Sequence, residues 1–302
     1  MADFVSGFWN GYVMIITALS LVFCAFVLMS NNTKREEGPP KLHGHVWDED
    51  LAEYNNPLPR WWFYLFWMTL LFGVAYLALY PGFGNFRGLL NWSATGQYYN
   101  EMDLADERYG PLFARYAEFD VEELAADPEA MSTGQRLFQT YCEQCHGADA
   151  RGSRGFPNLT DESWHWGGDP ESIRTTITGG RTGMMPALGA AIGADGVRNV
   201  AHYVRSLNGL AHESLRAGRG AEVFAQNCVA CHGTDASGTP AMGAPALNDG
   251  VWLWGSSEAA IAANVNNGIE NRMPGFGDFL GEDKVHVLTA YVWGLSQRTE
   301  ED

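Results

Sequence analysis

Two short stretches decide the fold of this 302-residue chain, "CEQCH" at residues 142–146 and "CVACH" at residues 228–232. Each stretch places two cysteines around two other residues and follows them directly with a histidine. The pattern CxxCH therefore occurs twice, and the four thiols have to be explained as two equivalent pairs. The spacing of these residues and the sequence around them distinguish between the possible roles of the four thiols.

The CxxCH pattern allows four kinds of chemistry. A structural disulfide is the first, but cysteines this close form a tight redox ring and not a staple between distant segments. A thioredoxin-like dithiol lacks the βαβ setting that it needs, and two Cys with one His are only three zinc ligands, crowded on one turn. Covalent attachment of c-type haem is the fourth, and CxxCH is its signature. The thiols add to the haem vinyl groups and the histidine binds the iron, which predicts two sets of contacts: Cys142, Cys145 and His146 for one haem, and Cys228, Cys231 and His232 for the other.

The two motifs belong to a longer internal repeat of roughly 80 residues. Three further pairs of segments match at an offset of 88 residues: "LTDESWHWG" (159–167) with "LNDGVWLWG" (247–255), "MMPALG" (184–189) with "RMPGFG" (272–277), and "VRNVAHYVRSL" (197–207) with "VHVLTAYVWGL" (285–295). The repeat predicts two mainly helical domains, residues 131–212 and 213–302. Each has a helix, CxxCH, a glycine-rich irregular stretch, a short helix, a Met loop and a final helix. Strand signals are weak throughout.

The repeat also selects a sixth ligand for each iron. Only Met185 and Met273 occupy equivalent positions in both copies, and each precedes a proline that stiffens the loop presenting the sulfur. Thioether ligation raises the reduction potential of haem iron, which suits an electron carrier. Core packing is the alternative for any single Met. Bis-histidine ligation is the weaker alternative, because other sulfur and imidazole groups have no equivalent in the other copy: Met131, Met184, Met242, His165, His202 and His286.

The matched tryptophans of the repeat leave two explanations open. They either wall the haem, with indole N–H groups near a propionate, or pack as ordinary aromatic side chains. Haem itself explains how domains of this size, so rich in glycine, gain an apolar centre.

Two uncharged stretches precede the repeat. No charged residue occurs over residues 4–30 or 61–86, and a helix needs about 20 apolar residues to cross a membrane. We predict a first transmembrane helix within residues 1–30 and a second over residues 61–82, ending near Tyr80 before "PGFGNF". The aromatic run "WWFYLFW" is typical of a membrane interface. Buried globular helices are the alternative. A cleaved signal peptide is disfavoured, because the start lacks a basic region and a small-residue cleavage site.

The positive charges give an orientation. The connection over residues 31–60 holds Lys34, Arg35, Lys41 and Arg60, and the positive-inside rule places it in the cytoplasm. Both termini and both cytochrome domains are then expected in the periplasm of a bacterial inner membrane. Cys24, inside the first span, is interpreted as a packing residue, and His43 and His45 as solvated loop residues.

An acidic linker is predicted over residues 83–130. Its helix-prone part, residues 94–130, either packs against a neighbouring subunit or is a disordered tether. The whole chain carries a formal net charge of −17, which makes nucleic acid an unfavourable partner. The charge fits a basic protein partner attracted from a distance, or serves only solubility.

Each repeat resembles a class I cytochrome c domain. Two such domains behind membrane spans, with "YPGFGNFRGLLNWS" at residues 80–93 after the second span, are similar to the dihaem subunit III of cbb3-type cytochrome c oxidases, the FixP/CcoP family. The resemblance covers essentially the whole chain. Members of this family often have one span, so the extra N-terminal span is a departure.

The resemblance implies a mainly α protein that carries electrons through two covalent haems c. The donor would be a soluble periplasmic cytochrome c with a basic face, and the acceptors the monohaem and catalytic haem–copper subunits. No oxygen chemistry is expected on a chain whose irons have six ligands. The resemblance also implies two ligand pairs and two prolines whose carbonyls orient the proximal histidines: His146 with Met185, His232 with Met273, and Pro157 and Pro245.

Two other functions compete with this one. The chain could be the cytochrome subunit of another periplasmic dehydrogenase or reductase complex. It could also be a dihaem peroxidase, which needs one iron with a vacant or displaceable ligand.

Overall fold

The computed structural model describes residues 6–32 and 41–297. These residues are mainly helical, as predicted, and form two compact units, Met1–Arg108 and Tyr109–Asp302. Two small antiparallel sheets of two strands each, one in each unit, complete the described secondary structure.

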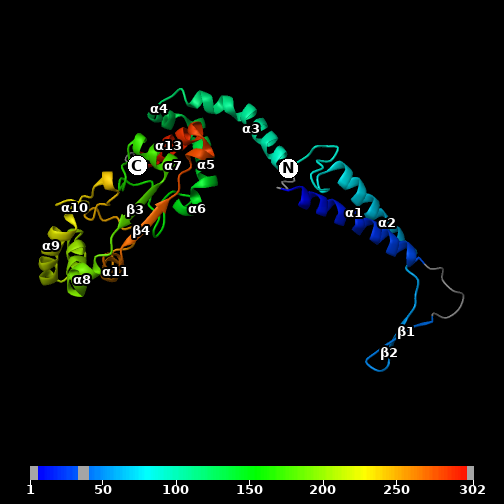
Figure 1. Cartoon of the computed structure of the whole chain (residues 1–302). Helices are drawn as coiled ribbons and strands as arrows, with labels where there is room; N and C mark the ends of the chain where they lie inside the picture. Colours follow the sequence, from blue (N-terminus) through cyan, green and yellow to red (C-terminus); the bar gives the residue numbers. More distant parts are fainter. Residues whose placement is uncertain (1–5, 33–40, 298–302) are drawn as a thin grey trace. The chain divides into compact units, whose positions relative to one another are not determined.

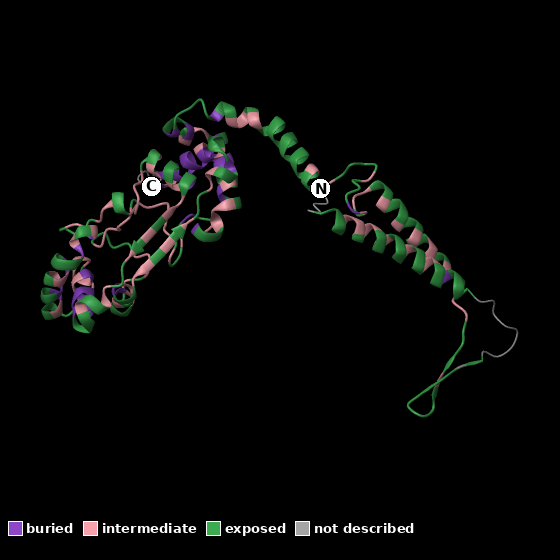
Figure 2. Cartoon of the chain, viewed as in Figure 1, coloured by how far each residue is buried: buried purple, intermediate pink, exposed green. Residues whose placement is uncertain are grey.

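The first unit contains two helices that are long and apolar enough to cross a membrane, α1 (Gly7–Ser30) and α2 (Arg60–Leu79). Helix α1 lies within the first predicted segment, and α2 begins one residue before the second and ends at Leu79, near Tyr80 as expected. Among their described residues only Leu28 is buried, and Figure 2 shows both helices almost entirely exposed or partly exposed. Apolar helices with so little protein cover have the character of lipid-facing helices and not of a soluble core.

The segment after α2 folds back onto α1. The side-chain oxygen of Asn10 in α1 accepts a hydrogen bond of 2.6 Å from the backbone N–H of Asn85. Gly84 lies against Asn10 and Met14 with a φ of +60°, so a larger residue would collide with both side chains. The glycines of "PGFGNF" therefore allow a tight turn that joins the two apolar helices.

The connection between α1 and α2 contains a hairpin that the sequence analysis did not expect. Strands β1 (Leu42–Trp47) and β2 (Leu51–Tyr54) pair antiparallel across a short turn. The strands are short and mostly exposed, so no clear alternation of buried and exposed residues marks them in the sequence. His45 is exposed and Cys24 is partly buried in α1. Lys34, Arg35 and the side chain of His43 lie outside the described residues.

The second unit follows the sequence repeat element by element. Helix α3 (Ala94–Tyr116) crosses the division between the two units. The remaining elements, in chain order, are α4 (Val121–Ala126), α5 (Pro128–Tyr141), α6 (Glu143–His146), α7 (Pro170–Gly179), β3 (Arg181–Met185), α8 (Gly189–Leu207), α9 (Ser214–Asn227), α10 (Val229–His232), η1 (Pro240–Met242), α11 (Glu258–Asn267), β4 (Ile269–Met273), α12 (Gly277–Leu280) and α13 (Glu282–Gln297).

The two repeats exchange their final helices. Helix α5 of the first repeat packs against α13 of the second, and α9 of the second packs against α8 of the first. The rings of Phe138 and Tyr291 lie 5.5 Å apart, and those of Tyr203 and Phe224 lie 5.2 Å apart. Figure 1 shows α5, α6, α7 and α13 together, and α8 to α11 grouped elsewhere in the unit. We call these groups the first module and the second module.

The predicted boundaries, 131–212 and 213–302, thus describe the sequence repeat but not the packing. Each module draws helices from both repeats. Glycine allows the close helix crossing in each module. A Cβ on Gly134 would lie 2.6 Å from the Cβ of Tyr291, and one on Gly220 would lie 2.8 Å from the Cβ of Tyr203. The equivalent helices carry equivalent surfaces, so the repeat alone does not reveal which copy a helix packs against.

A two-stranded ribbon joins the modules. Strands β3 and β4 come from different repeats and pair antiparallel over five residues, with Arg181 opposite Met273 and Met185 opposite Ile269. The two methionines therefore lie at opposite ends of one ribbon.

The end of the predicted linker is part of the first module. Tyr116, Val121 and Leu124 are buried against Val287 and Ala290 of α13. Asp120 and Asp127 begin α4 and α5, and each side-chain carboxylate accepts a hydrogen bond from the first turn of its helix. The interpretation of residues 94–130 as a disordered tether is therefore wrong for the part that packs here. Packing against a neighbouring subunit stays a prediction.

Candidate functional site

Each CxxCH motif forms a short helix directly after the first long helix of its repeat. His146 at the end of α6 and His232 at the end of α10 are both buried. The Nδ1 atom of His146 lies 3.0 Å from the carbonyl oxygen of Pro157, and Nδ1 of His232 lies 3.0 Å from that of Pro245. A carbonyl only accepts, so Nδ1 carries the proton and donates. This tautomer leaves Nε2 with a lone pair that can bind iron.

Burial shifts the pKa values of several motif side chains. Burial lowers the pKa of His146, outweighing its hydrogen bond to Pro157, so its imidazole is neutral and can act as a ligand at neutral pH. Burial, together with the neighbouring Cys145, raises the pKa of Cys142 to about 11. The pKa of Cys228 is also raised, mainly by burial. None of the five cysteines, all within the described residues, forms a disulfide.

A cavity of about 930 Å³ runs past both motifs. Its lining includes both proximal histidines and both predicted methionines, so the four predicted iron ligands face one continuous space. Aromatic and aliphatic side chains make up much of the rest, among them Phe138, Leu159, Trp164, Phe224, Leu247 and Trp252. An apolar cavity with a few convergent ligating groups is what a macrocycle such as haem requires.

Each predicted methionine packs in the module that contains the CxxCH motif of the other repeat. Met273 packs in the first module with Cys142 and Trp164, and Met185 packs in the second module with Trp252 and the buried Cys228. The expected pairs, His146 with Met185 and His232 with Met273, stay a prediction, and this packing favours His146 with Met273 and His232 with Met185 instead. The repeat shows which methionine of each copy is special, but only the exchange of strands decides which histidine it faces.

The loops that carry the methionines are fixed by the partner repeat. After Met273, the N–H of Phe276 donates to the carbonyl of Ile177 at the end of α7, at 2.8 Å. After Met185, the N–H of Leu188 donates to the carbonyl of Val265 at the end of α11, at 2.9 Å. The two hydrogen bonds occupy equivalent positions, so each Met-Pro loop is held by the helix that precedes the other Met loop.

The other candidate sulfur ligands differ in exposure. Met184 and Met242 also line the cavity, but they are 77% and 55% exposed, whereas Met131 is packed in the first core. His202 accepts a hydrogen bond from the N–H of Glu213 and lies 3.5 Å from the Glu258 carboxylate. Both ring nitrogens of His202 therefore face other partners.

His286 and His165 complete the candidate imidazoles. The Nε2 atom of His286 donates to the carbonyl of Phe119, at 2.9 Å. His165 lines the large cavity without an equivalent imidazole in the other repeat. Burial lowers its pKa, although Asp249 and Asp161 act in the opposite direction.

The tryptophan segments contain contacts that the sequence did not reveal. Trp166 packs on Gly243 and Trp254 packs on Gly155, each across the boundary between repeats. The guanidinium of Arg181 lies 5.0 Å from the centre of the Trp166 ring, a cation–π distance. In addition, Ser163 donates to Asp249 at 2.7 Å. The contacts of Trp166 with Gly243, Trp254 with Gly155 and Ser163 with Asp249 were missed because each joins two repeats. The contact of Arg181 with Trp166 lies within the first repeat, but no local spacing marks it.

Comparison with known proteins agrees with this geometry. The family model described as the N-terminal domain of cytochrome oxidase-cbb3, FixP, matches residues 40–87. The model for cytochrome c oxidase, cbb3-type, subunit III matches residues 129–204 and 216–292.

Individual relatives extend over most of the chain. The cbb3-type cytochrome c oxidase subunit CcoP of Rubrivivax gelatinosus is 49% identical over 98% of this chain and 98% of its own length. CcoP of Cereibacter sphaeroides is 35% identical over 87% of this chain and 97% of its own. FixP of Azorhizobium caulinodans is 36% identical over 85% and 94%. The chain therefore belongs to the CcoP/FixP family, subunit III of the cbb3-type cytochrome c oxidases.

Proposed function

We propose that this membrane-anchored subunit holds two covalent haems c and carries electrons from a soluble cytochrome c to the other subunits of a cbb3-type oxidase. The observation that carries the proposal is the shared cavity, which two carbonyl-oriented histidines and two Met-Pro loops line together. Haem iron, when bound, supplies the one-electron exchange between its ferric and ferrous states. The monohaem and catalytic subunits are the proposed acceptors.

The proposed ligand pairs are crossed. His146 and Met273 would hold the haem attached at Cys142 and Cys145, because Met273 packs in the first module. In the second module, His232 and Met185 would hold the haem attached at Cys228 and Cys231. The protein's part is to fix these donors. Pro157 and Pro245 hold each imidazole in one tautomer and orientation, and the Met-Pro loops hold each thioether opposite.

The membrane arrangement follows from the first unit. We propose that α1 and α2 both span the membrane, with the connection between them in the cytoplasm and both termini in the periplasm. The basic residues of the connection and the length and apolar character of the two helices support this. The net charge of −17 supports a donor with a basic face.

A ligand exchange tests the crossed assignment. The background is a full-length chain in which Cys228 and Cys231 are replaced by Ala, so that only the haem at Cys142 and Cys145 is attached. Replacement of a thioether by imidazole lowers the potential of haem iron. We expect Met273→His to lower the midpoint potential in this background and Met185→His to leave it unchanged.

Other outcomes decide against parts of the proposal. A lower potential with Met185→His alone would mean that each repeat supplies both ligands of its own haem. No change with either variant would remove methionine ligation altogether. A peroxidase activity that survives in a five-coordinate Met273→Ala variant would favour the peroxidase alternative over the electron carrier. A pyridine haemochrome assay on the wild-type complex should count two haems c on this subunit.

A further inference from the structure

Two glycines flank the methionine ribbon at equivalent positions. Gly180 follows α7 and precedes β3, and Gly268 follows α11 and precedes β4. Their φ angles are +71° and +74°, a region that glycine adopts without a steric penalty. The two residues lie 88 positions apart, so the repeat preserves both the residue type and its backbone conformation.

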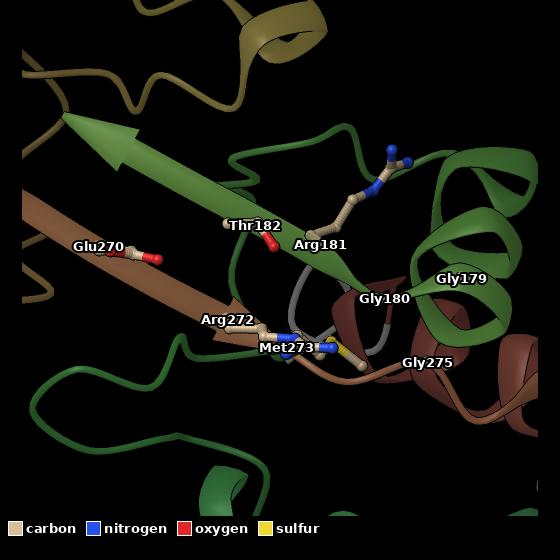
Figure 3. Close-up of a pocket in the computed structure, with 8 residues that line it drawn as sticks. All are labelled: Gly179, Gly180, Arg181, Thr182, Glu270, Arg272, Met273 and Gly275. Carbon is tan, nitrogen blue, oxygen red and sulfur yellow. The ribbon is translucent and has the colours of Figure 1, made fainter.

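Each glycine packs against the backbone of the methionine loop on the other strand. A Cβ on Gly268 would lie 2.6 Å from the carbonyl oxygen of Met185 and 2.8 Å from the N–H nitrogen of Ala187. A Cβ on Gly180 would overlap the carbonyl oxygen of Met273 and lie 2.6 Å from the nitrogen of Gly275. Figure 3 shows Gly180 beside Met273 and Gly275, where the start of β3 meets the end of β4.

We propose that Gly180 and Gly268 are positioning residues for the sixth haem ligands, Gly180 for Met273 and Gly268 for Met185, each acting across the ribbon on the other repeat's ligand. This inference rests on the proposed ligation of haem iron by the two methionines. The glycines touch the ligand backbone and not the reacting centre, so their effect passes through the methionine loop.

Neither side of the contact can move freely. The N–H of Gly180 donates to the carbonyl of Thr176 at 2.9 Å, and that of Gly268 donates to Asn264 at 2.9 Å, so each glycine ends a helix. The atoms opposite are backbone, which cannot turn away as a side chain can. An added methyl group must therefore displace the methionine loop.

The displaced loop is also tethered close to the ligand. Phe276, three residues after Met273, is hydrogen-bonded to Ile177 on α7, and Leu188, three residues after Met185, is hydrogen-bonded to Val265 on α11. Displacement of the carbonyl of Met273 or Met185 therefore acts on a segment of three residues whose far end is held by a hydrogen bond. The expected result is a lengthened or broken bond between sulfur and iron, while the rest of the module stays folded.

The chain offers a matched control in the same region. Gly179, the last residue of α7 and the neighbour of Gly180, has open space where a Cβ would lie. Its φ angle is not positive. Alanine at this position changes the same helix end without touching a methionine loop.

The test uses the full-length chain with both haems attached. The readouts are the charge-transfer absorption band of methionine-ligated ferric haem, the midpoint potentials, and carbon monoxide binding to ferrous iron. We expect Gly180→Ala and Gly268→Ala each to lose one haem's share of the band, lower one potential and open one iron to carbon monoxide. Gly179→Ala should leave all three readouts unchanged.

A second control separates the steric contact from the backbone angle. Gly180 (φ +71°, ψ −179°) lies in a region that essentially only glycine adopts, and Gly281, after α12, has similar angles (φ +80°, ψ +162°) but open space where a Cβ would lie. Gly281→Ala should therefore carry the backbone cost and keep the band, whereas Gly180→Ala should lose it. A Gly180→Ala or Gly268→Ala variant with the normal helical circular dichroism and an intact band would overturn the inference.

The one-haem background lacking Cys228 and Cys231 distinguishes failure of this inference from failure of the crossed assignment. In this background, an effect of Gly180→Ala without an effect of Gly268→Ala supports both the glycine role and the crossed ligand pairs. An effect of Gly268→Ala alone keeps the glycine role but overturns the crossed ligand pairs. No effect of either variant on a folded chain overturns the glycine role.

Discussion

The two modules share one set of contacts and differ in another. Both orient the proximal histidine through a proline carbonyl at 3.0 Å, and both fix the methionine loop through the end of a helix from the partner repeat. A haem iron bound by histidine and methionine, as proposed, would need both contacts. The duplicated sequence would keep them because each proposed haem would need them independently.

The differences lie around the haem sites. The first module has additional cover from α4 and the end of α3, which bury Tyr116 and Leu124 on α13. Its Cys145 is exposed, whereas the equivalent Cys231 is partly buried. The comparison teaches that the modules share the contacts of the proposed ligands and differ in the side chains packed around them.

Deletion of α13 is the most severe way to test the exchange of helices. Removal of residues 282–302 takes Val285, Leu288, Tyr291 and Val292 out of the first core. Burial of each such side chain contributes about 1.5–3 kcal/mol, and a domain is stable by only about 5–15 kcal/mol. We expect the first module to unfold, although the deletion lies in the second repeat.

Limited proteolysis should then cleave around Cys142 while the peptide around Cys228 stays protected. Protection of Cys142 with loss of Cys228 would mean that each repeat folds on itself.

The helix crossing gives the next largest effect. A methyl group on Gly220 would collide with the backbone of Asn199 and the Cβ of Tyr203, both on α8. Overpacking of this kind costs about 1–3 kcal/mol, which exceeds the gain of about 1 kcal/mol from placing Ala in a helix. Gly220→Ala should therefore lower the denaturant midpoint of unfolding.

Gly218, on the same helix α9, is the control. Its Cβ position is open, so Gly218→Ala should raise stability by up to about 1 kcal/mol. Equal effects of the two substitutions would show that α8 does not cross α9 at Gly220.

One titratable side chain distinguishes the tryptophan segments of the two repeats. His165 stands where the second repeat has Leu253. Burial lowers the pKa of His165 in the folded chain, so the unfolded chain binds its proton more readily. Stability should fall as the pH decreases below about 6.5, the unperturbed value, and by no more than about 1.4 kcal/mol per pH unit. His165→Leu should remove this part of the loss between pH 7 and pH 5 in thermal unfolding. An unchanged pH profile would show that His165 is not protected from protonation.

The smallest expected effect concerns two equivalent helix caps. Asp169 caps α7 by accepting from the N–H of Ser172, and Ser257 caps α11 by accepting from Ala260. The pKa of Asp169 is lowered by hydrogen bonds from the Ser172 hydroxyl and N–H. Its contribution is therefore present above about pH 3.9 and is lost as the pH falls through the lower folded value.

Asp169→Ser copies the second repeat into the first. At neutral pH it should change stability by less than about 0.5 kcal/mol, because Ser and Asp cap helices about equally well. Between pH 4 and pH 2 the variant should lose less stability than the wild type in thermal unfolding. A variant that is equally acid-sensitive would show that this carboxylate does not contribute to the acid response.

Local patterns predicted much of the site. The CxxCH motifs predict thioether cysteines and proximal histidines, and the prolines expected to orient those histidines do accept hydrogen bonds from His146 and His232. The alignment of the repeats selected Met185 and Met273, and both line the haem cavity. The apolar helices were located within a few residues, because a membrane span depends on length and composition alone.

Long-range contacts were not predictable in the same way. Arg181 acts on Trp166, and Ser163 on Asp249, through contacts that no spacing in the sequence announces. The β1–β2 hairpin was missed because its exposed side chains carry no clear pattern. The strands β3 and β4 exist only because each finds the other at a distance of 88 residues along the chain.

The sequence by itself determined the two CxxCH motifs, the family they point to, the equivalent Met-Pro pairs and the apolar helices, because these depend on residue type and on short, fixed spacings. The tertiary structure alone decided that the repeats exchange helices and strands, and hence which methionine faces which histidine. The physical reason is the duplication itself. The two copies present nearly identical packing surfaces, so pairing within or between repeats satisfies the same local rules, and the choice depends on how the intervening chain connects them.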